Sequence, residues 1–175
     1  TEVYTNLIEA VHHNLPALHK YVKLRKELLG VDELRFSDLY VPIVEDIDLT
    51  FTYEQACEII LEALNPMGEE YLALVRKGLS ERWVDVYETP GKRSGAYSAG
   101  GFGMHPVILM NFQGKLDDVF TLIHEMGHSI HTYLSCENQP SCYSDYVIFV
   151  AEVASTCNEA LLTHYFLEPN YVCRI

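Results

Sequence analysis

The feature that most constrains this chain is the segment at residues 121–133, which reads TLIHEMGHSIHTY. His124 and His128 are four residues apart, so on a helix they lie within about 40° of each other and their imidazoles can converge on one ion. Glu125 lies one position round the helix, near enough to reach a metal-bound water without ligating the metal. Neutral imidazoles suit Zn²⁺, and a catalytic zinc site needs three protein ligands and an open position. The segment predicts a helix over residues 117–135 that carries part of a site for one zinc ion.

The surrounding sequence decides the interpretation, because an H-E-x-x-H pattern alone arises by chance in roughly three per cent of chains with these His and Glu frequencies. Gly127 lies inside the predicted helix at a cost of about 1 kcal/mol relative to Ala, which is typical of a place where another backbone comes close. Residues 144–167 predict a second helix that is apolar nearly all the way round and is therefore expected to be buried. Both features favour a functional site on the first helix.

A polar stripe runs along the otherwise apolar surface of the second predicted helix. Its members are Glu152, Ser155, Thr156 and Glu159. The two glutamates are seven residues apart and almost eclipsed. Buried carboxylates are costly unless cations, hydrogen-bond donors or a metal compensate them. A narrow stripe that faces solvent is the alternative. Because Glu152 comes early on the helix and can fold back beside the histidines, we predict it as the third zinc ligand. Glu159 is expected behind the ligands or outside the site.

Two other residues were weighed as the third ligand. His131 shares the face of the histidine pair, but it lies about 10 Å along the helix from His124. One ion at about 2.1 Å from each nitrogen cannot easily bind both of them and His128 on a straight helix. Glu137 falls in the predicted loop after the helix. The metzincin pattern needs Gly at position 131 and His at position 134, where this chain has His131 and Leu134, so that class is excluded.

The first part of the chain, residues 1–89, predicts mostly helices. Pro16 predicts a break between helices at residues 2–14 and 17–29, and Gly30 predicts the end of the second one. The remaining expected elements are a connecting segment at residues 31–50, a helix that begins at the capping-box pair Thr52 and Gln55 and ends near Pro66 and Gly68, a helix over residues 69–83 and a short strand over residues 84–88.

The composition of the sequence changes at residue 90, where the helical patterns end. The segment at residues 90–103, PGKRSGAYSAGGFG, is rich in glycine and predicts an irregular loop. The run HPVILMNF at residues 105–112 predicts a short strand, and Pro106 predicts an edge strand because its missing N–H would leave a gap in a central ladder. Residues 90–175 would then hold the loop, the edge strand and a two-helix zinc site. We expect one partial catalytic domain, mainly α with a small β-sheet.

Composition excludes several classes of function. The formal net charge is −13 and no stripe is rich in Lys or Arg, which argues against nucleic acids and anionic membranes as partners. No run of 18 apolar residues predicts a membrane span, and the N-terminus lacks the pattern of a signal peptide. The five cysteines show no C-x-x-C pairing, so we expect reduced, mostly buried thiols in a cytoplasmic protein.

The segments at residues 95–131 and 138–168 resemble oligoendopeptidase F, one of the thimet-oligopeptidase-like zinc peptidases. The resemblance implies a mostly helical, zincin-like metallopeptidase core. It also implies that an edge strand of the small sheet lies beside the site and holds the substrate backbone. The run at residues 105–112 and the glycine-rich loop before it would occupy that place.

The resemblance also assigns roles to residues. The family's zinc ligands match His124 and His128 and, through the E-V-A-S-T motif, Glu152. Its catalytic glutamate matches Glu125. Members of the family are longer, and a later segment supplies tyrosine and histidine groups that this chain does not match.

The sequence therefore predicts a zinc metalloendopeptidase that hydrolyses peptide bonds in oligopeptides. Zinc would lower the pKa of its bound water and polarise the peptide carbonyl, and Glu125 would take the proton of the water and pass it to the leaving nitrogen. The main alternative is a catalytically incomplete fragment that binds zinc or peptide without turnover. A zinc hydrolase of another substrate class and a helical scaffold without metal are further alternatives, and the sequence leaves the oligomeric state open.

Overall fold

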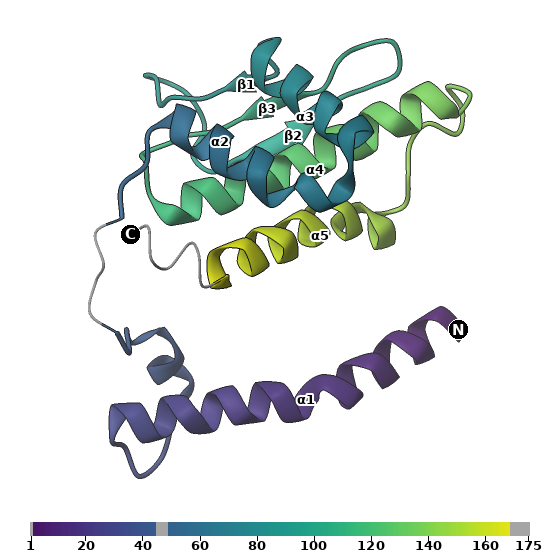
Figure 1. The fold of residues 1–175 in the computed structure, drawn as a ribbon. Coiled ribbons are helices and arrows are strands. Elements are labelled where there is room, and N and C mark those ends of the chain that lie inside the picture. Colours follow the sequence, from purple (N-terminus) through teal and green to yellow (C-terminus); the bar gives the residue numbers. More distant parts are fainter. Residues whose placement is uncertain (1, 45–48, 169–175) are drawn as a thin grey trace. The chain divides into compact units, whose positions relative to one another are not determined.

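The computed structural model describes residues 2–44 and 49–168 of the chain (Figure 1). Its backbone contacts divide the chain into two compact units, Thr1–Asp48 and Leu49–Ile175. The fold is mainly helical with one small sheet, as the sequence predicts. The single partial catalytic domain, with its change of character at residue 90, stays a prediction.

The first unit contains the long helix α1 (Glu2–Leu29) and the short 3₁₀-helix η1 (Phe36–Tyr40). Arg25 joins them, although it is charged and only 5% exposed. Its Nη2 donates to the carbonyl oxygen of Asp38 at 2.9 Å and to that of Val41. These hydrogen bonds compensate the buried guanidinium and attach η1 to the helix.

The predicted break at Pro16 is wrong, because α1 runs through it without interruption. A proline inside a helix removes one backbone hydrogen bond and crowds the preceding turn. The helix-forming segments on both sides nevertheless continue the same helix. Its predicted end is confirmed, since α1 stops at Leu29 and Gly30 has a left-handed φ of 64°.

The second unit begins with helices that follow their predicted signals. The predicted capping box is confirmed: Gln55 N–H donates to the Thr52 hydroxyl at 3.2 Å, and Thr52 N–H donates to the Gln55 side chain at 2.8 Å. The elements of this part are α2 (Tyr53–Ala63), the 3₁₀-helix η2 (Asn65–Met67) and α3 (Glu69–Ser80).

The small sheet has the strand order β1-β3-β2, and it corrects two predictions. Its strands are β1 (Val84–Asp85), β2 (Tyr97–Ala99) and β3 (Val107–Leu109). Strand β3 lies in the centre, parallel to β1 and antiparallel to β2, so the predicted edge position is wrong. Pro106 is tolerated because it precedes the first paired residue, Val107. The glycine-rich segment is not wholly irregular, since it contains β2, which forms one edge of the sheet.

The helix that carries the histidine motif, α4 (Leu116–Asn138), lies at the centre of this unit (Figure 1). It contacts α2, α3, β2, β3 and α5. Its apolar face is fully buried together with side chains from α2, α3, β3 and the residues next to them, and this core includes Ile60, Leu64, Leu72, Ile108, Leu122, Ile123, Met126 and Ile130. Among the described residues, no helix is long and apolar enough to cross a membrane.

The last helix, α5 (Ile148–Leu167), packs against α4 through one face only. Its buried residues are Ser155, Asn158 and Leu162, a stripe that contains two polar side chains. The prediction that α5 is buried all the way round is wrong, because Ile148 and Val153 are 82% and 60% exposed. Apolar composition does not show which face of a helix meets its neighbours.

The cysteines also differ from the prediction. Cys57 and Cys136 are half-buried free thiols, whereas Cys142 and Cys157 are free and exposed. Cys142 lies in the connection between α4 and α5, and Cys157 lies on α5 beside the buried stripe rather than in it. Cys173 lies outside the described residues. The expected burial of most thiols is therefore wrong for two of the four that are described.

Two contacts fix the position of α5 on α4. A Cβ added to Gly127 would lie 2.8 Å from the Cα of Ser155 and 3.0 Å from the carbonyl oxygen of Ala154. The glycine thus permits the close backbone approach that the sequence predicts. Beside it, the buried amide of Asn158 donates to the carbonyl oxygen of Ile123 at 3.2 Å and accepts from the Tyr71 hydroxyl at 3.0 Å.

We expect Gly127→Ala to displace α5 and to lower the free energy of unfolding. The added methyl group would meet backbone atoms, and overpacking costs about 1–3 kcal/mol. The better helix propensity of Ala offsets about 1 kcal/mol of this cost. The remaining decrease in the free energy of unfolding should be measurable by urea denaturation. Gly101→Ala is the matched control, because the added Cβ there meets nothing within 4 Å. Equal stability of both variants would contradict the close approach.

We expect Tyr71→Phe to destabilise the protein by about 1–2 kcal/mol, because the buried amide oxygen of Asn158 would lose its donor. In an Asn158→Leu background the same change should cost less, since no acceptor remains. Thermal or urea unfolding of the four proteins in this double-mutant cycle gives the coupling energy. A coupling near zero would show that the hydrogen bond does not hold α5.

Candidate active site

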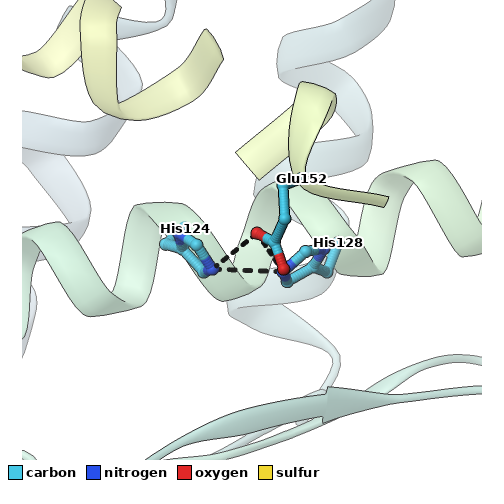
Figure 2. Close-up of side chains that lie close together, drawn as sticks. All are labelled: His124, His128 and Glu152. Carbon is cyan, nitrogen blue, oxygen red and sulfur yellow. Dashed lines mark hydrogen bonds and ion pairs between the residues drawn. The ribbon is translucent and has the colours of Figure 1, made fainter. Parts of the chain in front are cut away.

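Three side chains from two helices converge at the centre of the second unit (Figure 2). His124 and His128 project from α4, and Glu152 reaches them from the first half of α5. The two Nε2 atoms are 3.1 Å apart, and Oε2 of Glu152 lies 3.4 Å from each of them. In the described parts of the chain, these are the three residues whose ligand atoms could hold one metal ion.

The spacing of these atoms fits a zinc ion. Zinc binds nitrogen and carboxylate oxygen at about 2.0–2.2 Å in a tetrahedron, so neighbouring ligand atoms lie about 3.3–3.6 Å apart. The three observed separations, 3.1, 3.4 and 3.4 Å, are close to the edges of such a tetrahedron. Two histidines and one carboxylate also form a ligand set of catalytic zinc sites, which leaves the fourth position for water or substrate.

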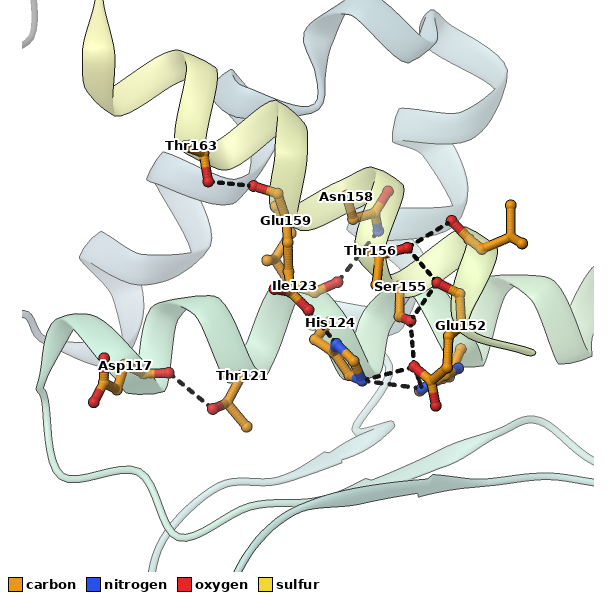
Figure 3. Close-up of polar contacts among 12 residues, drawn as sticks. Asp117, Thr121, Ile123, His124, Glu152, Ser155, Thr156, Asn158, Glu159 and Thr163 are labelled. Atoms are coloured by element: carbon orange, nitrogen blue, oxygen red, sulfur yellow. Dashed lines mark hydrogen bonds and ion pairs between the residues drawn. The ribbon is translucent and has the colours of Figure 1, made fainter. Parts of the chain in front are cut away.

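Hydrogen bonds behind these three residues orient two of them (Figure 3). The Glu159 carboxylate contacts Nδ1 of His124, which favours a proton on Nδ1 and leaves Nε2 as an electron-pair donor. The buried Ser155 hydroxyl donates to Oε2 of Glu152 at 2.8 Å. The structure therefore brings Glu152 to the histidine pair and places Glu159 behind it.

Glu125 lies on the same turn of α4 as the histidine pair and is only 7% exposed. Burial raises the pKa of its carboxyl group above the usual value, and the neighbouring Glu152 adds to the rise. His124, His128 and a hydrogen bond from the backbone of Ser98 oppose the rise. A carboxylate with a raised pKa is a stronger base, which suits a group that must accept a proton.

Strand β2 lies next to this helix and supplies Ser98. Besides its backbone contact with Glu125, its hydroxyl lies 2.7 Å from the hydroxyl of Ser129, which is fully buried on α4. These contacts tie an edge of the sheet to the turn of the helix that carries the histidines.

The two rejected ligands lie apart from this cluster. The ring of His131 stacks on Tyr146 at a centroid distance of 3.8 Å, and burial lowers the pKa of His131. Glu137 is exposed in the last turn of α4, which extends to Asn138, so its predicted position in a loop is wrong. Neither residue belongs to the group that could hold a metal among the described residues.

Sequence reasoning missed three residues of the site. Ser155 belongs to the polar stripe in the sequence, but no role is predicted for it there. Its spacing of three residues from Glu152 could have indicated its hydrogen bond to that carboxylate. Ser98 and Ser129 had no such signal, because the contact between them joins a loop strand to a helix 31 residues further along the chain.

The family model of peptidase family M3 matches residues 1–172 of the chain. The chain is 52% identical to oligopeptidase PepF of Bacillus subtilis (strain 168) over 166 residues, which cover 95% of this chain and 25% of that protein. It is 48% identical to the chromosomal oligoendopeptidase F of Lactococcus lactis subsp. cremoris over 169 residues, or 97% of this chain and 28% of that protein.

A solved structure from Chlamydophila abortus superimposes on 95% of this chain and 28% of its own, with a TM-score of 0.85 and 42% identity. The chain therefore spans about a quarter of the length of the relatives it matches. The resemblance to oligoendopeptidase F and the zincin-like fold predicted from the sequence are confirmed. Since the family match extends over nearly all of its residues, the chain belongs to peptidase family M3.

Proposed function

We propose that this chain carries the catalytic zinc site of a metalloendopeptidase that hydrolyses oligopeptides. His124, His128 and Glu152 hold one Zn²⁺, and Glu125 is the general base. The observation that carries the proposal is the nearly buried carboxylate of Glu125 beside a cluster of two histidines and one glutamate with the spacing of a zinc tetrahedron.

When bound, zinc supplies Lewis acidity, which lowers the pKa of a water and polarises a peptide carbonyl. Glu125 accepts the proton of the attacking water and then gives it to the leaving nitrogen. Burial supports this role because it makes the carboxylate more basic. Glu159 holds the ring of His124 in one orientation, and Ser155 does the same for the Glu152 carboxylate.

The similar proteins and the edge of the small sheet both support the proposed class of substrate. The similar proteins named above are an oligopeptidase and an oligoendopeptidase, which supports an oligopeptide as the substrate. Strand β2 offers an edge with which an extended peptide could pair, so that its backbone is held beside the ligands. A cytoplasmic location stays a prediction.

The decisive experiment measures metal content and cleavage in the same preparation. We expect elemental analysis to find one zinc per chain and mass spectrometry to find internal cuts in an unstructured nine-residue peptide. The second candidate function is zinc or peptide binding without turnover, and the same experiment separates it from the first. Zinc without cleavage would support it, whereas a chain that bound neither zinc nor peptide would contradict both proposals.

We expect Glu125→Gln to keep zinc but to lower peptide hydrolysis by about 10²–10⁴-fold, because an amide cannot accept the proton of the water. Glu137→Gln is the matched control, since it makes the same change on an exposed side chain of the same helix. Zinc content and initial rates of cleavage are the measurements. Near-normal turnover of Glu125→Gln would remove this residue from the mechanism.

We expect Glu152→Ala to abolish tight zinc binding and Glu159→Ala to weaken it by about 10–100-fold, as is typical of groups that orient a ligand. Glu159→Gln should lose less affinity than Glu159→Ala, because the amide oxygen can still accept from Nδ1 of His124. Competition with a zinc-sensitive dye gives the dissociation constants. If Glu159→Ala abolished binding and Glu152→Ala retained it, the assignment of the third ligand would be wrong.

A further inference from the structure

A cavity of about 390 Å³ lies beside the first half of α4. Thr121 of α4 lines it together with Gly95 and Ala96, which directly precede strand β2. Its volume is at the low end of ligand sites, which span about 300–1,000 Å³, so it could hold one large side chain. The site residues described above do not line this cavity.

The position of the cavity connects it to the proposed active site. Thr121 lies one helical turn before His124 and Glu125, or about 4.5–6 Å along the helix axis (Figure 3). Gly95 and Ala96 lead into β2, whose Ser98 contacts Glu125. A peptide that runs along β2 past the ligand atoms would therefore place a side chain next to the cleaved bond over this cavity.

Hydrogen bonds within the chain hold the residues that line the cavity in place before any peptide binds. The side-chain amide of Asn111 donates to the carbonyl oxygens of Arg93 at 2.8 Å and Gly95 at 2.9 Å, which fixes the loop that leads into β2. Lys92, whose side chain is 4% exposed, donates to two backbone carbonyls at 2.7 and 3.0 Å.

The charge of the lining is negative once these contacts are counted. The Lys92 ammonium group also pairs with the Asp85 carboxylate at 3.2 Å, so its charge is already compensated. Glu88 and Asp118 add two carboxylates to the lining. Asp118 accepts from the backbone N–H groups of Gln113 and Lys115 through Oδ2 alone, at 3.0 and 2.9 Å. A cation is the charge that this lining would favour.

We propose that the cavity is a specificity pocket for a lysine or arginine side chain at a residue that flanks the cleaved peptide bond. The proposal rests on the proposed function, because it assumes that peptides lie along β2. Its recognition is electrostatic: Glu88 at the exposed rim attracts the cation, and Asp118 at the start of α4 adds a second carboxylate to the lining. Thr121 and Asn111 add polar groups to the same lining.

The test compares nine-residue peptides that differ only at the two positions flanking the cleaved bond, where they carry lysine, norleucine or glutamate. Norleucine keeps the four carbon atoms of the lysine side chain but lacks its ammonium group. Initial rates of cleavage are measured with the zinc-loaded chain, and binding of the same peptides to its Glu125→Gln form is measured by fluorescence anisotropy. We expect lysine at one of the two positions to be preferred over norleucine by about three- to tenfold in both measurements.

Glu88→Gln should remove most of that preference, because it deletes an exposed carboxylate of the lining without touching the fold. Glu70→Gln is the matched control: it removes one exposed carboxylate from α3 and should leave the preference unchanged. Cleavage without a preference for lysine, or a preference that is unchanged in Glu88→Gln, would contradict the proposed role of the pocket. The proposed function would still stand. If the zinc-loaded chain neither cleaved nor bound any of the peptides, the proposed function would fail and the pocket with it.

Discussion

The close approach of α5 to α4 at Gly127 is the contact on which the site depends. With no side chain at this position, the backbone of Ser155 can lie directly against α4 at Gly127. Glu152 of α5 then reaches the ring nitrogens of the two histidines, while Ser155, one turn further along the same helix, donates to its carboxylate. A side chain at 127 would meet the backbone of α5, so the glycine is what allows Glu152 to come this close to the histidine pair.

Buried polar groups specify this arrangement more closely than apolar packing does. The face of α5 that meets α4 contains Ser155 and Asn158, and Asn158 is hydrogen bonded to groups from two other helices. Apolar contacts are non-directional, whereas leaving a buried amide without its hydrogen-bond partner costs about 1–3 kcal/mol. Asn158 therefore fixes the register of α5, and through it the positions of Glu152 and Glu159.

Much of this site could be predicted because its residues lie close together in the sequence, on one helix and the helix that follows it. The four-residue spacing of His124 and His128 fixes their geometry as soon as α4 forms, and the next helix had few polar residues that could serve as ligand. Features set by tertiary contacts could not be read in the same way. The central position of β3, the strand within the glycine-rich segment and the exposed face of α5 all depend on which surfaces meet.

The three proposed zinc ligands lie on two helices, which the chain connects through the residues between Asn138 and Ile148. A metal ion held by all of them acts as a removable cross-link between α4 and α5. By mass action, a ligand at a hundred times its dissociation constant adds about 2.7 kcal/mol to the stability of the form that binds it. Free zinc would in this way set how tightly α5 is held, and chelation would first loosen the helix whose outer face is already exposed.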